Sequence, residues 1–542
     1  MARVLGAAAP VLSAIVLVYL GRHERLGYDS FWHVFIARQL DWSQFWLEVT
    51  DNAHPPLFYL VLKSTLLIGY SSLIYRLPSI LAIVIAGALM CAIASRVVTN
   101  RWLPGVAALA FGLSYSAITM GLEVRAYALA TCLTLTALYH YLRLVESRFG
   151  EQDPKARALF ASFITLALLT HYSVAFVAGA AVLSPVLLAA ANREYRAGMS
   201  RAWTRALPAN LLTFGGPLAV LGLVYVGHAP RWAQLTQHLT GFMFDPGKEG
   251  LVAFALRTTR AEIELFTPAA LTDHAVLATV AGGVAVFLFL AIRGRRLEGE
   301  KRTVAMILPV MLAIMIAFTL AAAVAGRYPF GGLLRHQFFL LPFAILSLIV
   351  VLDRIDQTLP AGWPRRALAA AVLAGCAASA VVWMVTFTAT SGLMYQRQVD
   401  TFRSLVPSAR AVYVDQFSLI PLFMHYHEWE WRLEQPAASP SSFRVWKVSK
   451  DGRELRVCRD LAHWQLDISE AALYANLQKC LETTGAPEVA MFRLGRNGLP
   501  PGWQGGEMST LMEELAAKAG LRPVSIAIRR GAVFAAFDRA EQ

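Results

Sequence analysis

Apolar runs of about 20 residues recur along the first 390 positions of this 542-residue chain, and each run can cross roughly 30 Å of hydrocarbon. Hydrophobic residues make up 56% of the chain and charged residues only 16%, too few charges for the polar surface of a soluble fold of this size. The pattern predicts a polytopic α-helical membrane protein. Residues 391–542 are polar, interrupted by Pro and Gly, and lack a spanning run, so we expect a separate soluble domain there.

The positive charge of the chain is gathered in short loops. A formal net charge of +13 would suit nucleic-acid binding, but the Lys and Arg residues cluster between apolar runs, for example at 96–101, 143–157, 193–205, 293–302 and 354–366. The positive-inside rule describes this distribution for cytoplasmic loops. We therefore assign the charge to membrane topology and exclude nucleic acid as a partner.

The apolar runs predict about eleven spans, and the basic clusters between them assign the direction of each crossing. The predicted spans are residues 4–21, 78–95, 102–119, 126–143, 157–170, 173–191, 206–226, 273–292, 303–325, 337–352 and 366–388. The first span is expected to be retained, because no convincing small-x-small cleavage site precedes Gly21. Loops 22–77 and 227–272 then lie outside, and an odd number of spans also puts the C-terminal domain outside. Residues 55–70 are apolar but short and contain Lys63, so we expect a helix at the outer interface.

The domain boundaries follow from this path: a transmembrane domain over 1–390 and a soluble, periplasmic domain over 391–542. The soluble domain alternates strand-like runs ("RAVYVDQF", "FRVWKV", "PEVAMFRL", "GAVFAAF") with the helical run "MSTLMEELAAKAG", which predicts an α/β or α+β domain. Cys458 and Cys480 lie in it and could pair in an oxidising compartment.

Ionisable residues near the outer ends of spans are the candidates for function, because such groups are costly close to lipid. Asp29, in the loop after the first span, could be a helix N-cap, a solvated acid or a general base. In "DNAHPPLFYL", Asp51 and His54 precede a rigid pair of prolines. They could mark a helix entry, orient a ligand or bind a metal.

Further polar residues follow at later outer turns. Glu123, Arg125 and Tyr127 stand in "LEVRAYAL", where they could form a local ion pair or hold a phosphate through the arginine fork. The remaining candidates are His171 and Tyr172 in "THYS" and Arg335 and His336 in "GGLLRHQFFLLPF". An arginine at an outer helix end is unexpected under the positive-inside rule, which suggests a bound anion.

Acids and arginines from several helices thus converge on one face of the membrane. The pattern fits a lipid-linked phosphate with its tail in the bilayer and its head outside. Asp29, Glu123, His54 and His171 could also supply oxygen and nitrogen ligands to a divalent metal, although the spacing of residues on separate loops does not predict one. We therefore predict no metal ligands and leave a divalent metal as an open alternative.

The chain resembles bacterial GT-C type glycosyltransferases of the protein O-mannosyltransferase and aminoarabinose-transferase group, a glycosyltransferase family 39-like set. Their motifs read approximately "LDE…HPPLYYLLL…RLPSALFG…QEARMYAL…THY…RYLLPLLP". This chain has, in the same order over roughly residues 1–350, "YDS" at Asp29, "HPPLFYLVLK" at His54, "RLPSILAI" at Arg76, "LEVRAYAL" at Glu123, "THYS" at His171 and "LRHQFFLLPF" at Arg335.

The resemblance implies a multi-pass enzyme of the bacterial inner membrane that transfers a sugar from a polyprenyl phosphate to a lipid, glycan or protein acceptor at the periplasmic face. Asp29 matches the family's catalytic aspartate. Two positions depart from the family: Ser30 stands where an acid often follows that aspartate, and His336 stands where the family usually has tyrosine. Because of these two departures, the resemblance does not specify the substrate or the use of a metal.

The predicted roles are as follows. Asp29 takes the acceptor's proton, with Glu123 orienting Arg125 or touching the acceptor, and the anomeric centre inverts. Arg125, Tyr127 and Arg335 bind the donor phosphate. His54, Asp51, His171, Tyr172 and His336 bind or orient substrate. The competing predictions are a membrane transporter or lipid-linked-sugar flippase, whose polar site would lie nearer mid-membrane, and a membrane-anchored binding protein acting through its C-terminal domain.

Overall fold

A computed structural model describes residues 2–265, 300–358 and 391–539, with residues 370 and 374, apart from short gaps at 24–25, 53, 151–152, 192, 240–242, 406–409, 436–442, 461–467, 495–507 and 530–531. The chain forms two compact units. The helical unit comprises Met1–His23, His54–Phe58 and Arg76–Thr388, and the sheet unit comprises Glu24–Ala53, Tyr59–Tyr75 and Ala389–Gln542. Most of the first long loop, which the sequence analysis grouped with the transmembrane domain, thus belongs with the C-terminal domain.

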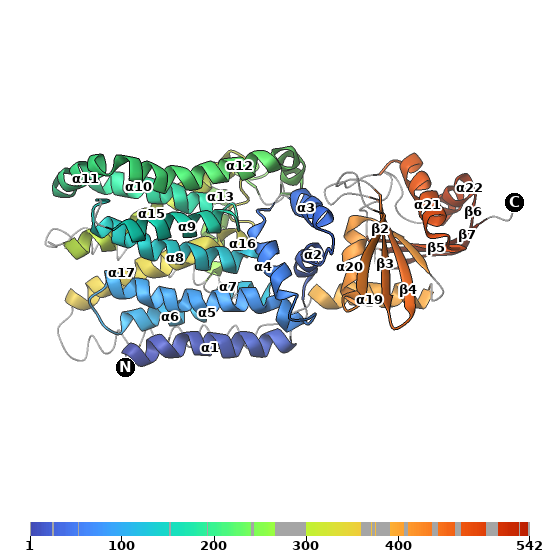
Figure 1. The fold of residues 1–542 in the computed structure, drawn as a ribbon, viewed down its shortest axis with the longest axis horizontal. Helices are drawn as coiled ribbons and strands as arrows, with labels where there is room; N and C mark the ends of the chain where they lie inside the picture. Colours follow the sequence, from blue (N-terminus) through green and yellow to red (C-terminus); the bar gives the residue numbers. More distant parts are fainter. Residues whose placement is uncertain are drawn as a thin grey trace. The chain divides into compact units, whose positions relative to one another are not determined.

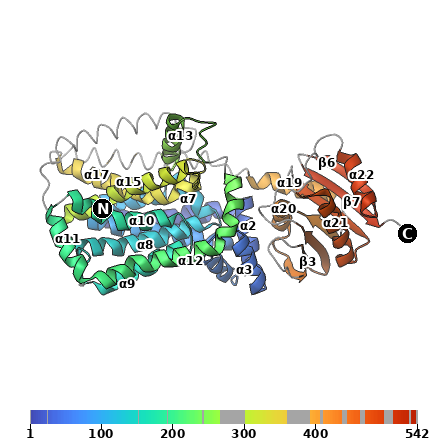
Figure 2. The same ribbon diagram turned by 90° about the horizontal axis from the view of Figure 1, so that it is seen from above.

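The helical unit is a bundle in which most helices run side by side (Figures 1 and 2). The closest pairs include α8 with α9, α1 with α6 and α10 with α15. Its helices are α1 (Ala2–His23), α5 (Ser72–Val97), α6 (Leu103–Gly112), α7 (Tyr115–Leu122), α8 (Ala126–Glu146), α9 (Pro154–Leu168), α10 (Val174–Ala191), α11 (Arg193–Arg205), α12 (Leu207–Leu239), α13 (Leu251–Glu264), α15 (Glu300–Val324), α16 (Leu334–Gln337), the 3-10 turn η4 (Phe338–Leu340) and α17 (Leu341–Thr358). The boundary with the sheet unit falls inside α5.

Within the described residues, five helical segments are long and apolar enough to cross a membrane: Ser72–Val97, Ala126–Glu146, Leu207–His228, Val304–Val324 and Leu334–Gln357. The bent pair α6 and α7 would make six, and Ala8–His23 and Val174–Ala190 are shorter apolar helices. The chain is a multi-pass membrane protein, as predicted. The span predicted at 273–292, and all of the span predicted at 366–388 except residues 370 and 374, lie outside the described residues, so the total of about eleven stays a prediction.

Two predicted segments differ from the observed helices. The span predicted at 102–119 is broken, with an angle of 51° between α6 and α7. Ser114 causes the break because its hydroxyl accepts a hydrogen bond from the Ala117 amide at 3.2 Å and so begins a new helix. The loop predicted at 227–272 is partly helical, since α12 continues to Leu239 and α13 follows. Polar residues after position 226 end the apolar run without ending the helix.

The sheet unit contains a mixed seven-stranded sheet in the order β2-β3-β4-β1-β5-β7-β6. Among the described strands, the pairs that β1 makes with β4 and β5 are parallel and the other pairs are antiparallel. The strands are β1 (Ala411–Val414), β2 (Glu430–Gln435), β3 (Arg444–Lys450), β4 (Arg453–Arg459), β5 (Glu488–Leu494), β6 (Leu521–Arg529) and β7 (Ala532–Arg539). The four strand-like runs seen in the sequence correspond to β1, β3, β5 and β7.

Helices lie on both sides of this sheet, as Figure 1 shows. They are α19 (Ser391–Leu405), α20 (Gln416–Tyr426), α21 (Glu470–Thr484) and α22 (Met508–Lys518). The first loop adds α2 (Tyr28–Ala37) and α3 (Trp42–Asp51), and α4 (Leu57–Thr65) crosses the boundary between the units. Successive side chains of a strand point to opposite faces of the sheet. Tyr413 and Met491 pack toward α21 and α22, whereas Phe492 stacks on Phe402 of α19 with 5.4 Å between ring centroids.

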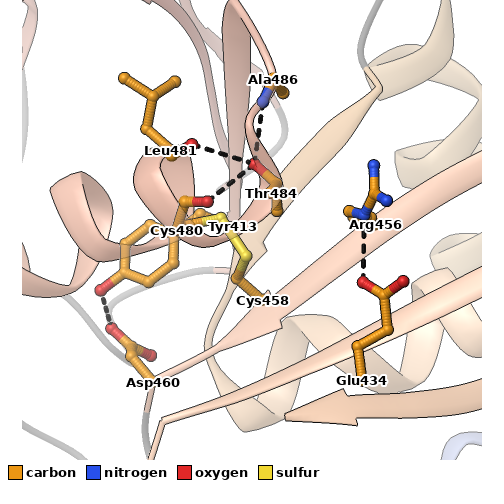
Figure 3. The surroundings of a disulfide bond; sticks show 9 residues. All are labelled: Tyr413, Glu434, Arg456, Cys458, Asp460, Cys480, Leu481, Thr484 and Ala486. Atoms are coloured by element: carbon orange, nitrogen blue, oxygen red, sulfur yellow. Dashed lines mark hydrogen bonds and ion pairs between the residues drawn. A yellow bond between two sulfur atoms is a disulfide. The ribbon is translucent and has the colours of Figure 1, made fainter.

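A disulfide joins Cys458 at the end of β4 to Cys480 in α21, 22 residues apart (Figure 3). Both residues are fully buried in the core between the sheet and the helices α21 and α22. Close to the disulfide, the Tyr413 hydroxyl donates to Asp460, which also pairs with Arg493 at 2.7 Å. The pairing that the sequence left open is therefore present in the structure.

Asp415, which follows β1, makes the stability of this domain depend on pH. The carboxylate caps α20 by accepting from the Ser418 amide at 2.9 Å, and burial raises its pKa to about 6 despite the nearby Arg493. Because the folded pKa exceeds the ordinary value of 3.8, the neutral carboxyl favours the folded state. That contribution is complete below pH 3.8 and is lost as the pH rises through 6.

We therefore predict that Asp415→Asn, which keeps a capping oxygen but carries no charge, stabilises the domain by about 1–3 kcal/mol at pH 8. The difference should shrink toward zero below pH 4, where both proteins carry a neutral side chain. Thermal unfolding of the full-length protein in detergent between pH 4 and 8 measures it. Equal stabilisation at every pH would show that charge burial is not the cause.

Candidate functional site

The turn between α7 and α8 places the "LEVRAY" residues. Glu123 is the C-cap of α7 and is half-buried, and Arg125 is the N-cap residue of α8 with 8% of its surface exposed. The Arg125 guanidinium lies 5.5 Å from the centre of the Tyr127 ring. A buried cation at a helix N-terminus adds to the positive end of the helix dipole, so this turn favours an anion.

Arg76 of α5 holds this turn in place. The guanidinium is 2% exposed, and it donates to the Leu122 carbonyl at 2.7 Å and to the Gly21 carbonyl at 2.6 Å. It thereby connects the C-terminal ends of α7 and α1 to α5. Its acceptor in α7, Leu122, directly precedes Glu123. The sequence analysis gave Arg76 no role. An arginine just before the span predicted at 78–95, at its outer end and far from the basic loops, was the signal that could have identified it.

We expect Arg76→Met to destabilise the protein by about 3 kcal/mol, because two buried carbonyls lose their charged donor. The matched control is Arg96→Met at the other end of the same helix. Arg96 forms a partly exposed ion pair with Glu146 at 2.5 Å, so its loss should cost within about 1 kcal/mol. Thermal unfolding in detergent compares the two variants, and equal losses would contradict the structural role of Arg76.

His171 lies close to this turn, in the connection between α9 and α10. Its ring centroid is 4.6 Å from that of Tyr127 and 6.0 Å from that of His54. Burial, assisted by the Arg125 charge, lowers the pKa of His171 to about 3. The ring is therefore neutral at physiological pH, and its Nδ1 lies 2.8 Å from the Ser173 hydroxyl. It can orient a polar ligand but cannot serve there as a cationic acid.

The neighbouring Tyr172 also stays neutral, because burial raises its pKa above the ordinary value. Its hydroxyl makes a hydrogen bond with Nδ1 of His228 in α12. Arg335 and His336 are the two middle residues of the short helix α16, which packs against α7 and α13. The Tyr328 hydroxyl donates to the His336 carbonyl at 2.6 Å and so helps to fix α16 in place.

A small, mainly apolar pocket lies next to this polar cluster. Its lining comes from α8, the start of α10 and η4, and includes Tyr127, Thr131, Ser173, Phe338 and Phe339. Tyr127 thus contributes both to the pocket and to the cluster with Arg125 and His171. The charge of Arg125 at the start of α8 suits a ligand with an anionic group.

The two predicted aspartates of the first loop belong to the sheet unit. Asp29 lies in the first turn of α2, where an acid is favoured by the helix dipole. The N-cap of that helix is Gly27, so the interpretation of Asp29 as an N-cap is wrong. Asp51 is the last residue of α3, and its side chain lies outside the described part of the chain.

Among the predicted site residues, the structure brings together Arg125, Tyr127, His171 and His54 within the helical unit. Within the residues that the structure describes, no group of three or more His, Cys, Asp or Glu side chains is close enough to hold a metal ion. A second residue that the sequence analysis missed is Glu48. Its signal was an acid at helical spacing from Phe45, Val49 and Asn52, on the buried face of α3.

No protein-family model matches the chain, and no curated protein matches it. Among solved structures, the crystal structure of ArnT from Cupriavidus metallidurans bound to undecaprenyl phosphate aligns over 98% of this chain and 97% of that chain, with a TM-score of 0.52 and 14% identity. The apo state of that protein aligns over the same shares with a TM-score of 0.54 and 14% identity. Arabinofuranosyltransferase AftD from Mycobacteria aligns over 100% of this chain and 40% of that chain, with a TM-score of 0.47 and 17% identity.

The chain therefore has a GT-C-like fold, as its motifs predicted: a helical membrane bundle with a C-terminal sheet domain. The similarity to ArnT extends over nearly the whole of both chains, so it includes the C-terminal domain that the sequence motifs did not cover.

Proposed function

We propose that this protein is a glycosyltransferase that moves a sugar from a polyprenyl-phosphate donor to a lipid, glycan or protein acceptor. The observation that carries the proposal is the fold, shared over 98% of the chain with a protein whose crystal structure contains undecaprenyl phosphate. The local geometry supports it. Arg125 at a helix N-terminus suits the phosphate.

The proposed reaction is a single displacement. The acceptor oxygen or nitrogen attacks the anomeric carbon, its proton passes to Asp29, and the bond from that carbon to the phosphate oxygen breaks. Arg125 and Arg335 stabilise the charge that the departing lipid phosphate gains. Glu123 orients Arg125 or the acceptor, and the neutral rings of His171 and Tyr172 orient substrate, as we propose for Asp51, His54 and His336. This path inverts the anomeric centre.

We further propose that the site faces the periplasm of a bacterial inner membrane. The Cys458–Cys480 disulfide supports an oxidising compartment for the C-terminal domain, since disulfides persist there and are rare in the cytosol. The basic clusters in the connections opposite the proposed site support the same orientation.

An assay in detergent micelles tests the proposal and separates it from transport. The purified protein is incubated with a panel of undecaprenyl-phosphate hexoses and pentoses and with delipidated envelope extract as acceptor source. A glycosyltransferase releases undecaprenyl phosphate. A flippase breaks no bond, so it leaves the donor chemically unchanged, and micelles offer no second compartment for transport. Retention of every donor unchanged would contradict the proposal. Mass spectrometry of lipid A, glycolipids and envelope proteins from a deletion strain then identifies the sugar and the acceptor.

A further inference from the structure

We propose that Glu48 is a positioning residue that docks the first loop on the C-terminal sheet and thereby fixes helix α2, whose first turn carries Asp29. The importance of Asp29 rests on the proposed function, whereas the docking rests on contacts inside the sheet unit. On this proposal the C-terminal domain serves catalysis by holding the loop that bears the base.

Glu48 binds at the edge of the sheet where the parallel strands end. Arg459 is the last residue of β4, and Arg444 begins β3 directly opposite it in the antiparallel register. Gln416 follows the end of β1 as the first residue of α20. Open sheets with parallel strands commonly bind ligands outside the carboxyl ends of those strands. Here the chain's own Glu48 supplies a carboxylate to that position.

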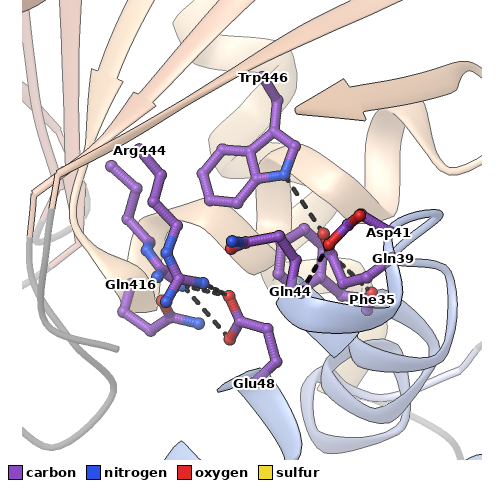
Figure 4. Close-up of polar contacts among 9 residues, drawn as sticks. Phe35, Gln39, Asp41, Gln44, Glu48, Gln416, Arg444 and Trp446 are labelled. Atoms are coloured by element: carbon purple, nitrogen blue, oxygen red, sulfur yellow. Dashed lines mark hydrogen bonds and ion pairs between the residues drawn. The ribbon is translucent and has the colours of Figure 1, made fainter. Parts of the chain in front are cut away.

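The contacts of Glu48 are buried and charged on both sides (Figure 4). Its Oε1 accepts from Arg444 Nη1 and, at 3.2 Å, from Arg459 Nη1. The exposed fractions are 2% for Glu48, 1% for Arg444 and 0% for Arg459. Arg459 also donates to Gln416. Removing one partner from such a buried set leaves the remaining charges uncompensated, which is strongly unfavourable.

The rest of α3 strengthens this docking. Its N-cap Asp41 accepts from the Gln44 amide at 3.0 Å, which stabilises the N-terminus of the helix. Phe45, Val49 and Asn52 share the buried face with Glu48, at the spacing of one side of a helix. Glu48 is therefore the single acid on the described buried face of α3, and its carboxylate meets two arginines.

Helix α2 is held by the same domain at its C-terminal end. Phe35 packs edge-on against Phe423 of α20, with 5.2 Å between ring centroids, and against Trp446 of β3 at 5.6 Å. The Trp446 indole donates to the Gln39 side chain at 3.5 Å (Figure 4). Arg38, the C-cap of α2, donates to the carbonyls of His427 and Trp429, the latter at 2.9 Å.

A lysine completes the end of α2. Lys63 of α4 donates to the Gln39 carbonyl at 2.5 Å and lies 3.3 Å from the Ala37 carbonyl, where a cation is favoured by the helix dipole. α2 has 10 residues and forms a short rigid rod, so fixing its C-terminal end fixes the direction of its first turn. Loss of the Glu48 anchor next to it should therefore change where Asp29 stands.

The docking test uses the full-length protein in detergent and hydrogen exchange of α2 and α3 peptides. Glu48→Gln keeps the shape of the side chain and removes its charge. We expect exchange in α2 and α3 to rise at least about 10-fold, with strands β1 and β5 unchanged, because local opening follows the lost contacts. The matched control is Glu434→Gln, which breaks the exposed Glu434–Arg456 pair of the same domain and should leave exchange unchanged.

The activity test measures kcat and KM for the polyprenyl-phosphate donor in the same variants. Because Glu48 is buried against Arg444 and Arg459, we expect kcat to fall by about 10–100-fold, as for a misplaced catalytic group, with the donor KM changed by less than about 3-fold. Phe35→Leu is the second variant. It leaves no buried charge unpaired, so it should fold normally, and we expect a smaller fall of kcat with the same unchanged KM.

Unchanged hydrogen exchange in Glu48→Gln would overturn the docking claim whether or not any donor is turned over. Increased exchange with full kcat would overturn the link from docking to Asp29. A wild-type protein that cleaves no donor would refute the proposed function and with it the catalytic part of this proposal, while the exchange result would still decide the docking.

Discussion

Replacing Asp29 with asparagine is expected to lower the rate of sugar transfer by about 10²–10⁴-fold, the range for loss of a general base. The amide is nearly the same size as the carboxylate but cannot accept the acceptor's proton. The loss should appear in kcat, because the proposed contact with the proton matters most in the transition state. The measurement is release of undecaprenyl phosphate by equal amounts of purified wild-type and variant protein.

The matched control is Asp41→Asn on the same loop. Asp41 is exposed and caps α3, a position at which asparagine serves as well as aspartate. Its variant should therefore retain wild-type activity and stability. If Asp29→Asn also transferred sugar at the wild-type rate, the assignment of the base would be wrong, and Glu123 would be the next acid to replace.

Arg125→Met is expected to lower kcat by about 10²–10³-fold, the usual effect of removing one donor that stabilises developing negative charge. Arg125→Lys should recover only part of this loss, because a lysine keeps the charge but lacks the planar fork that binds two phosphate oxygens. Both variants are assayed against the same donor lipid, with kcat and KM measured separately.

The control for Arg125 lies on the same helix. Arg143, near the other end of α8, forms a partly exposed ion pair with Asp153 at 2.7 Å. Arg143→Met should therefore leave activity unchanged and cost within about 1 kcal/mol of stability. Equal kcat values for Arg125→Met and Arg143→Met would exclude a role for Arg125 at the phosphate.

Local sequence patterns predicted most of the helices and the short-range part of the candidate site. Glu123, Arg125 and Tyr127 stand within five residues on one turn, so the motif alone placed them together. Hydropathy was less reliable for helix ends, because it marks where a chain leaves lipid and not where its backbone stops being helical. α12 shows this, since it continues to Leu239 beyond the predicted span.

Long-range pairing could not be predicted in the same way. Glu48 and Arg444 are 396 positions apart, and nothing in either neighbourhood specifies the other. Each reads locally as an ordinary charged residue, one on an amphipathic helix and one at the start of a strand. Their meeting depends on the folded sheet, whose strand order is not the order of the chain. The same holds for Arg76, whose carbonyl partners lie on two other helices.

The discontinuous sheet unit has a consequence for how the protein is made. The loop that ends at Tyr75 leaves the ribosome about 300 residues before the domain that begins at Ala389, an interval of roughly 15–60 s at ordinary rates of synthesis. During that time Phe35, Phe45 and Glu48 lack the surfaces that bury them in the finished protein. A nascent chain stopped before the C-terminal domain would expose this loop to proteases and to chaperones that bind apolar segments.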